Sequence, residues 1–211
     1  MSSQKLITVL GATGNQGGSV INTFLEQPQY RICGLTRTNS SAKAKALAER
    51  GVTMVAADLD DKVSLEAAFA GAHIIFIVSD YWGTLGALAS KAGPDQSESL
   101  YLKAAEIEKK QLVNAFDAAA RVPTLERIVL SSLQNVSKWS GGKYEHVYHF
   151  EFKARAAEYA AEAYPELWAK TSIFQADWFT SNYISNPMAM PRNVSRPRPS
   201  RHGLVVSAAM Y

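Results

Sequence analysis

Three glycines with the spacing G-x-x-G-x-x-G follow a β-rich run and precede a stretch with helical spacing. Glycines at such a turn let the backbone approach a pyrophosphate closely, and the helix that follows presents free N–H groups and a positive dipole end. The alternative is a merely tight turn, but the position between a strand and a helix favours a dinucleotide-binding loop. The predicted loop is Gly11-Ala12-Thr13-Gly14-Asn15-Gln16-Gly17.

The residue that ends the second predicted strand indicates which dinucleotide is bound. An NAD site usually places Asp or Glu there, about 20 residues after the loop, to bond the ribose hydroxyls. This sequence has Thr36-Arg37-Thr38 instead. Arginine cannot accept those hydrogen bonds, but its planar fork matches a phosphate, so NADP(H) is expected in preference to NAD(H). Lys43 and Lys45 would add positive charge nearby, and the alternative for Arg37 is a solvated surface side chain.

Carboxylates follow the third predicted strand, where the adenine lies in a sheet of this kind. Asp58 is the expected contact, whereas Asp60 and Asp61 fit equally well as caps of the next helix. Closely spaced carboxylates can bind a metal, but no His or Cys stands at ligand spacing with them. We therefore predict no metal site.

His149 and Lys153 lie one turn apart on one face of a predicted helix, and Ser131-Ser132 ends a strand before it. In a hydride-transferring enzyme this spacing would hold a proton donor beside a lysine that lowers its pKa and binds the ribose. Lys153 is predicted to bind the ribose or nicotinamide side, because its apolar neighbours make a bare lysine costly. His149 is the candidate proton donor, although a structural or surface role is favoured for it.

Strands and helices alternate along the chain, which predicts an α/β protein with a doubly wound parallel sheet and helices on both faces. Strands are predicted at residues 6–10, 30–36, 52–56, 73–78, 127–131 and 171–175. Helices are predicted at residues 19–25, from a cap at Ser40 or Ser41 to near Gly51, at 64–69, within 95–120, and at 149–164. Residues 135–143 are predicted to form a polar loop.

Composition narrows the class of protein. The chain has 211 residues, 47% of them hydrophobic and 19% charged, with a formal net charge of +3, as in ordinary globular proteins. Its basic residues are not interleaved with aromatic ones, so direct nucleic-acid binding is not expected. No stretch resembles a transmembrane span, so no membrane partner is expected. No signal peptide is recognisable, which predicts a cytoplasmic or nuclear location. The lone Cys33 is expected to be buried and inert.

Together these residues resemble the NmrA-like family, an atypical branch of the short-chain dehydrogenases/reductases. The resemblance runs from Leu6 to about Tyr183. Its most specific motifs are GATGNQGGSV (residues 11–20), LTR (35–37), FIVSDYW (76–82) and HFEFK (149–153).

The resemblance implies a role for each motif. The pyrophosphate would be held by residues 11–16, the 2′-phosphate by Arg37, and the adenine side by Asp58 and Leu59. Ser79, Asp80 and Tyr81 would line the cofactor after the fourth strand. The nicotinamide half would be approached by Lys153 and by the segment Trp178-Phe179-Thr180-Ser181.

The resemblance also implies two functions. Regulators similar to this chain bind NADP(H) and alter their association with transcription factors, and other members look like quinone or aromatic-substrate reductases. Active short-chain dehydrogenases carry Tyr-x-x-x-Lys, but His149 stands four residues before Lys153 here, and Tyr148 is one position out of register. We therefore expect a redox-sensing regulator that acts through protein partners. The alternative is an NADP(H)-dependent oxidoreductase on quinone-like or aromatic carbonyl substrates, with His149, or water held by Ser131 and Lys153, as the proton source.

The resemblance further implies a C-terminal substrate or partner domain. Residues 1–185 are expected to form the NADP-binding Rossmann domain, and residues 186–211 the start or remnant of an incomplete C-terminal subdomain.

Overall fold

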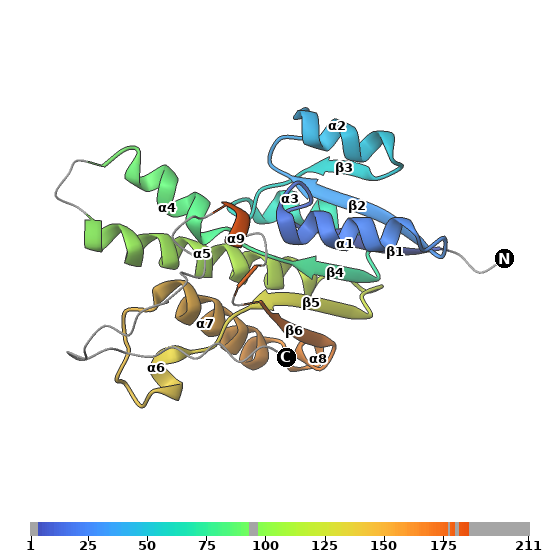
Figure 1. The fold of residues 1–211 in the computed structure, drawn as a ribbon. Helices are drawn as coiled ribbons and strands as arrows, with labels where there is room; N and C mark the ends of the chain where they lie inside the picture. Colours follow the sequence, from blue (N-terminus) through green and yellow to red (C-terminus); the bar gives the residue numbers. More distant parts are fainter. Residues whose placement is uncertain (1–3, 93–96, 177, 180–181, 186–211) are drawn as a thin grey trace, which may run out of the picture. The chain divides into compact units, whose positions relative to one another are not determined.

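The structure is a computed structural model that describes residues 4–92, 97–176, 178–179 and 182–185 (Figure 1). The chain divides into two compact units, Met1–Ala176 and Asp177–Tyr211. The first unit holds the sheet and the helices that pack on it. The predicted C-terminal segment, residues 186–211, lies outside the described residues.

Six parallel strands form one sheet in the order β3-β2-β1-β4-β5-β6 (Figure 1). The strands are β1 (Lys5–Val9), β2 (Tyr30–Thr36), β3 (Thr53–Ala56), β4 (Ile74–Ile77), β5 (Arg127–Ser132) and β6 (Thr171–Gln175). The predicted doubly wound parallel sheet is therefore confirmed. The chain winds from β1 toward β3 and then crosses back to β4, which places the reversal between β1 and β4.

Helices connect the strands. In the described part of the chain they are α1 (Asn15–Leu25), α2 (Ala42–Glu49), α3 (Lys62–Phe69), α4 (Tyr81–Ala89), α5 (Ser97–Ala119), α6 (Val136–Trp139), α7 (Tyr148–Ala163), α8 (Pro165–Trp168) and α9 (Asn182–Ser185). Ser41 caps α2, accepting a hydrogen bond from Ala44 N–H, which selects between the two predicted caps. None of the helices in these described ranges is long and apolar enough to cross a bilayer.

Four helices of the described chain, α4, α6, α8 and α9, are absent from the sequence prediction, and two of them carry an N-terminal cap that marks their start. α4 contains Gly83 and Gly86, which lower helix propensity, and its start is marked only by Asp80, whose carboxylate accepts a hydrogen bond from Gly83 N–H at 2.9 Å. α6 interrupts the segment predicted as a loop, where the Asn135 side chain accepts from Lys138 N–H at 3.0 Å. In α4 and α6 the capping residue, Asp80 or Asn135, is the sequence signal that marks the start of the helix.

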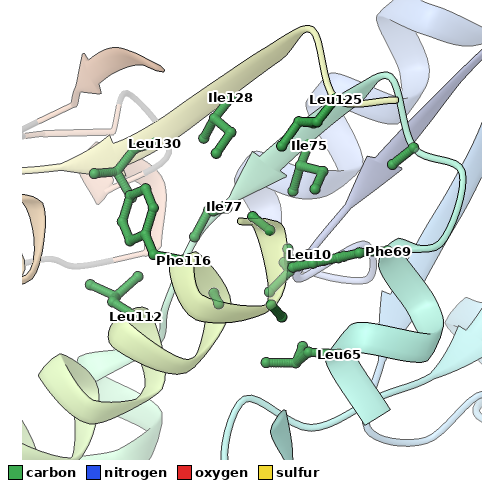
Figure 2. Close-up of a cluster of buried hydrophobic side chains, with 14 of the residues drawn as sticks. Leu10, Leu65, Phe69, Ile75, Ile77, Leu112, Phe116, Leu125, Ile128 and Leu130 are labelled. Atoms are coloured by element: carbon green, nitrogen blue, oxygen red, sulfur yellow. The ribbon is translucent and has the colours of Figure 1, made fainter. Parts of the chain in front are cut away.

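Side-chain alternation along the strands divides the core between the two faces of the sheet. On one face Ile21 of α1 and Leu47 of α2 pack with Ile7, Val9 and Phe76. The other face carries a larger cluster, in which side chains of α3, α5 and α7 meet those of β4 and β5. Figure 2 shows part of that cluster, with Leu65, Phe69, Leu112 and Phe116 turned toward Ile75, Ile77, Ile128 and Leu130.

The exposure of β6 and the burial of Cys33 can both be compared with the sequence predictions. Among the described residues β6 pairs with β5 alone, and its Ile173 and Phe174 are 46% and 49% exposed, so this strand is less buried than the strands at the centre of the sheet. Cys33 is buried as expected, and burial raises the pKa of its thiol.

Asp117 ties three helical segments together on the larger core face. Its Oδ1 accepts hydrogen bonds from the hydroxyls of Tyr159 and Tyr164, both at 2.9 Å, and its Oδ2 accepts from Lys62 Nζ at 3.1 Å. Burial acts to raise the pKa of Asp117, but the three hydrogen bonds outweigh it and hold the pKa below its ordinary value. The carboxylate form is therefore the one that stabilises the fold.

We expect Asp117→Asn to lower the free energy of unfolding by about 1.5–3 kcal/mol at pH 7, the usual contribution of hydrogen bonds to a charged group. Because the folded pKa is depressed, this contribution is present above the unfolded pKa of about 3.9 and is lost as the pH falls through the folded value. Urea unfolding of the two proteins between pH 7 and pH 3 measures the difference. A difference that stays constant down to pH 3 would contradict this assignment of the charge.

Candidate functional site

The glycine loop joins the carboxyl end of β1 to α1, at the reversal of the sheet. In open α/β sheets, ligands bind outside the carboxyl ends of the strands at this switch point. Gly11 has a φ of 62°, in the left-handed region that favours glycine. Its carbonyl accepts a hydrogen bond from Gly14 N–H at 2.8 Å. The loop therefore turns within a few residues from the strand into the helix.

The start of α1 is suited to an anion. Gly14 is the N-cap, so no side chain bonds the free N–H groups of the first turn, and that turn contains no acidic residue. A Cβ added at Gly14 would lie 3.2 Å from the Gly11 carbonyl oxygen, which is tight but not forbidden. Glycine thus leaves the positive end of the helix open, which is the cradle that a pyrophosphate requires.

Gly17 has a different role in the same loop. A Cβ there would overlap the Gly11 carbonyl oxygen and would lie 2.7 Å from the Gly11 carbonyl carbon and 2.9 Å from the Leu10 carbonyl oxygen. The first turn of α1 therefore packs directly on the backbone of the loop. The predicted residues 11–17 lie together as the loop and the first turn of α1, and their binding of a pyrophosphate remains a prediction.

Arg37 lies beside this loop. Ala12 N–H donates to the Leu35 carbonyl at 3.1 Å, which fixes the loop against the end of β2, and Arg37 follows that strand by one residue. Its side chain is exposed, and no ion pair joins it to another residue in the described ranges. The guanidinium is thus available to an anion held at the loop, although an exposed arginine remains the alternative.

The turn after β3 is held by several side-chain hydrogen bonds. Asp61 caps α3 and accepts its first backbone N–H groups, which confirms one of the capping alternatives. The Asp58 Oδ1 accepts from Asp60 N–H at 3.0 Å, and Asn114 Nδ2 donates to the Leu59 carbonyl at 2.8 Å. Contact of Asp58 and Leu59 with an adenine remains a prediction. Among the described residues, no group of His, Cys, Asp or Glu is arranged to hold a metal ion.

The three residues predicted to line the cofactor after β4 have distinct partners. Ser79 Oγ donates to Glu108 Oε1 at 2.8 Å. Asp80 caps α4. Tyr81 is buried, its hydroxyl donates to the Tyr101 carbonyl at 3.1 Å, and burial together with the Glu108 charge raises the pKa of Tyr81 to about 12. Each side chain thus has a structural partner, and contact of any of them with the cofactor remains a prediction.

Lys153 lies in a buried polar cluster. Its Nζ donates to Ser79 Oγ at 2.9 Å and also contacts Glu108 Oε1. The Lys153 side chain is only 12% exposed, and that of Glu108 is fully buried. Lys153 therefore reaches from α7 to the carboxyl end of β4, next to the strand that leads into the glycine loop.

His149 lies half-buried in a group of aromatic rings. Its ring centroid is 5.4 Å from that of Tyr81, 5.1 Å from that of Trp82 and 4.8 Å from that of Phe150. Burial lowers the pKa of His149, and the nearby charge of Lys153 lowers it further. The imidazole is therefore neutral at pH 7, and the packing agrees with the structural role that the sequence analysis favoured.

The segment 178–181, expected near the nicotinamide together with Lys153, falls in the second compact unit. The rings of Trp178 and Tyr183 meet edge to face with centroids 6.1 Å apart, and Asn182 N–H donates to the Phe179 carbonyl at 2.9 Å. Thr180 and Ser181 lie outside the described residues. The predicted approach of this segment to the cofactor remains untested.

Glu108 is the site residue that sequence reasoning missed. It lies on the face of α5 that also carries Ala104, Leu112 and Phe116, spaced four residues apart and buried. A lone glutamate in an apolar helical stripe was the available signal, because a carboxylate there needs a charged or hydrogen-bonding partner. The partner, Lys153, is 45 residues away in the sequence, and only the fold brings the two together.

Comparison with known proteins agrees with this architecture. Residues 3–202 match the NmrA-like family. The chain belongs to the NmrA-like family. One member, the NmrA-like family domain-containing oxidoreductase cpsB of Aspergillus campestris, is 28% identical over 159 residues, which are 75% of this chain and 42% of cpsB. The chain spans less than half the length of the curated relatives it matches.

Solved structures share the fold. NmrA, a negative transcriptional regulator in complex with NADP, is 20% identical with a TM-score of 0.61, over 82% of this chain and 45% of NmrA. The NADPH-dependent quinone oxidoreductase QOR2 from Escherichia coli, complexed with NADPH, is 21% identical with a TM-score of 0.59, over 87% of this chain and 53% of QOR2. The NmrA-like fold thus occurs in both a regulator and a reductase.

Proposed function

We propose that this NmrA-like chain binds NADP(H) and acts as a dinucleotide-sensing regulator through protein partners. Binding is supported by the open N-terminus of α1, by the exposed Arg37 beside it, and by the NADP complex of the similarly folded NmrA. In this proposal residues 11–16 hold the pyrophosphate, Arg37 the 2′-phosphate, and Lys153 the ribose beside the nicotinamide.

The observation that carries the regulatory role is the state of the hydroxyl and imidazole groups around Lys153. His149 is packed among aromatic rings, and because its pKa is lowered, little of the imidazolium form that could give up a proton is present at neutral pH. Tyr81 donates its hydroxyl to the Tyr101 carbonyl, and the Tyr148 hydroxyl lies 2.7 Å from His146 Nδ1. None of these groups is poised to give a proton to a substrate beside Lys153, whereas binding of a dinucleotide needs no such donor.

The proposal predicts binding without chemistry. Calorimetry is expected to detect binding of both NADPH and NADP+, while NADPH absorbance stays constant with a panel of quinones and aromatic aldehydes. Proteins retained by the immobilised chain are expected to differ between the two forms of the dinucleotide. Absence of binding to either form would overturn the proposal.

A second function is favoured by one surface feature. The Trp82 side chain is 61% exposed and its ring lies against His149, one turn from Lys153, which forms an aromatic wall suited to stacking a planar substrate. Such a chain would be an NADPH-dependent reductase of quinone-like or aromatic carbonyl compounds, with the dinucleotide supplying a hydride. Quinone-dependent oxidation of NADPH that disappears in Lys153→Ala, and is weakened in Trp82→Ala, would support this function over the first.

Replacing Arg37 tests the choice of cofactor. We expect wild type to bind NADPH more tightly than NADH, and Arg37→Ala to remove about 1.5–3 kcal/mol of that preference, the usual strength of a charge-assisted hydrogen bond. Arg31, an exposed arginine on β2 away from the glycine loop, provides the matched control Arg31→Ala. Calorimetric titration with both cofactors measures the preference, and unchanged discrimination in Arg37→Ala would make the assignment wrong.

A further inference from the structure

α5 carries a carboxylate where an apolar side chain would be expected. Glu108 is completely buried, and its neighbours along the helix face, Ala104 and Leu112, are buried as well. Moving a carboxylate out of water is costly, and an ion pair in the interior often stabilises no more than apolar packing of the same volume. Stability alone is therefore a weak reason for a glutamate at this position.

The partners of Glu108 come from two other elements. Its Oε1 contacts Lys153 Nζ of α7 and accepts a hydrogen bond from Ser79 Oγ at 2.8 Å. Lys153 Nζ also donates to Ser79 Oγ at 2.9 Å, so the three groups form a closed triangle at the carboxyl end of β4. A flexible lysine side chain is thereby held at one place.

The triangle leaves one donor and one acceptor atom free among the described residues. The Lys153 ammonium has three N–H groups, of which two are used within the triangle. The Glu108 Oε2 is buried and has no partner in the described part of the chain. The carboxylate thus makes its contacts through one oxygen, while the ammonium retains an N–H for a group beyond the triangle.

We propose that Glu108 is a positioning residue, which holds the charged Lys153 against Ser79 so that the remaining N–H of Lys153 is presented to a dinucleotide. The inference rests on the proposed NADP(H) binding, which it deepens. Glu108 itself is fully buried, so in this proposal it acts only through Lys153.

The chain provides a matched control. Glu151 is also buried, one of its oxygens contacts a cation and the other, Oε2, has no partner among the described residues. Its cation is Arg155, whose side chain is 47% exposed, and neither of them contacts Ser79 or Lys153 in the described interactions. Glu108→Gln and Glu151→Gln therefore remove the same charge from comparably buried positions, but only the first releases Lys153.

Two measurements test the proposal. In Glu108→Gln we expect the NADPH dissociation constant to rise about tenfold, as for loss of one hydrogen bond to a charged group, and Glu151→Gln to leave it unchanged. In a Lys153→Met background, Glu108→Gln is expected to cause no further loss, because the residue acts through the lysine. The second measurement is the rate at which acetic anhydride modifies the Lys153 amine in the absence of dinucleotide, followed by mass spectrometry. We expect this rate to increase in Glu108→Gln and to stay at the wild-type value in Glu151→Gln.

The outcomes separate the two proposals. Wild-type labelling of Lys153 together with wild-type NADPH affinity in Glu108→Gln would overturn the positioning role. An equal loss of affinity caused by Glu108→Gln with and without Lys153 would overturn it too, because the effect would be structural. If wild type fails to bind NADPH, the proposed function is wrong, and the labelling still decides whether Glu108 holds Lys153. Should Glu108→Gln fold poorly, the double variant Glu108→Gln/Lys153→Met, which leaves no unpaired buried charge, is used instead. Its NADPH affinity is compared with that of Lys153→Met alone.

Discussion

Gly17→Ala is expected to lower the free energy of unfolding by about 3 kcal/mol or more, although alanine is the better helix former. The added Cβ would lie 2.7 Å from the carbonyl carbon of Gly11 and 2.9 Å from the carbonyl oxygen of Leu10, and it would overlap the Gly11 oxygen. These atoms belong to the backbone of the loop and of the residue after β1, so they cannot rotate away as a side chain would. Urea unfolding followed by circular dichroism measures the loss.

Gly18→Ala is the control for this prediction. The residue is on the same helix, and a Cβ there would meet only the Ala12 carbonyl oxygen, at 3.7 Å, which is an ordinary contact. Helix propensity then dominates, and we expect a stability equal to wild type or higher by up to about 1 kcal/mol. If Gly17→Ala behaved like Gly18→Ala, the close packing of α1 on the loop would be wrong.

Gly14→Val is expected to raise the NADPH dissociation constant at least about a hundredfold, or about 2.8 kcal/mol, while the fold is kept. Gly14 has a φ of −91° and a ψ of 177°, an extended conformation that valine adopts readily, and its Cβ would lie 3.2 Å from the Gly11 carbonyl oxygen. The branched side chain would then occupy the space in front of the free N–H groups of α1. Calorimetry measures binding, and thermal unfolding verifies the fold.

A valine at an exposed position of another helix controls for the general effect of the substitution. Gly86 of α4 has no neighbour within 4 Å of an added Cβ, so Gly86→Val is expected to change NADPH affinity by less than about twofold. A folded Gly14→Val protein that binds NADPH like wild type would remove the glycine loop from the proposed site. Gly14→Val and Gly17→Ala together separate two roles of the loop: Gly14 leaves space for the pyrophosphate, and Gly17 lets α1 pack on the loop.

Most elements of the sheet were predictable because their signals are local. Strands buried on both faces read as short apolar runs, and the glycine loop between β1 and α1 marks the first crossover. The helix α4 was missed because Gly83 and Gly86 weaken the propensity signal, while its cap, Asp80, had been assigned to the cofactor. The sequence predicts β6 as a strand but does not predict that it is exposed. The burial of an edge strand depends on which other elements pack against it.

The sequence by itself determined the family, the doubly wound class of fold, the glycine loop and the place of Arg37 after the second strand. These depend on residues close together in the chain, whose spacing is set by strand and helix geometry. Only the tertiary structure decided that Gly17 packs against backbone, that His149 lies among aromatic rings, and that Lys153 is held by Glu108 and Ser79. Such contacts join residues from different elements, and a buried charge reveals its partner only when the fold has brought the two together.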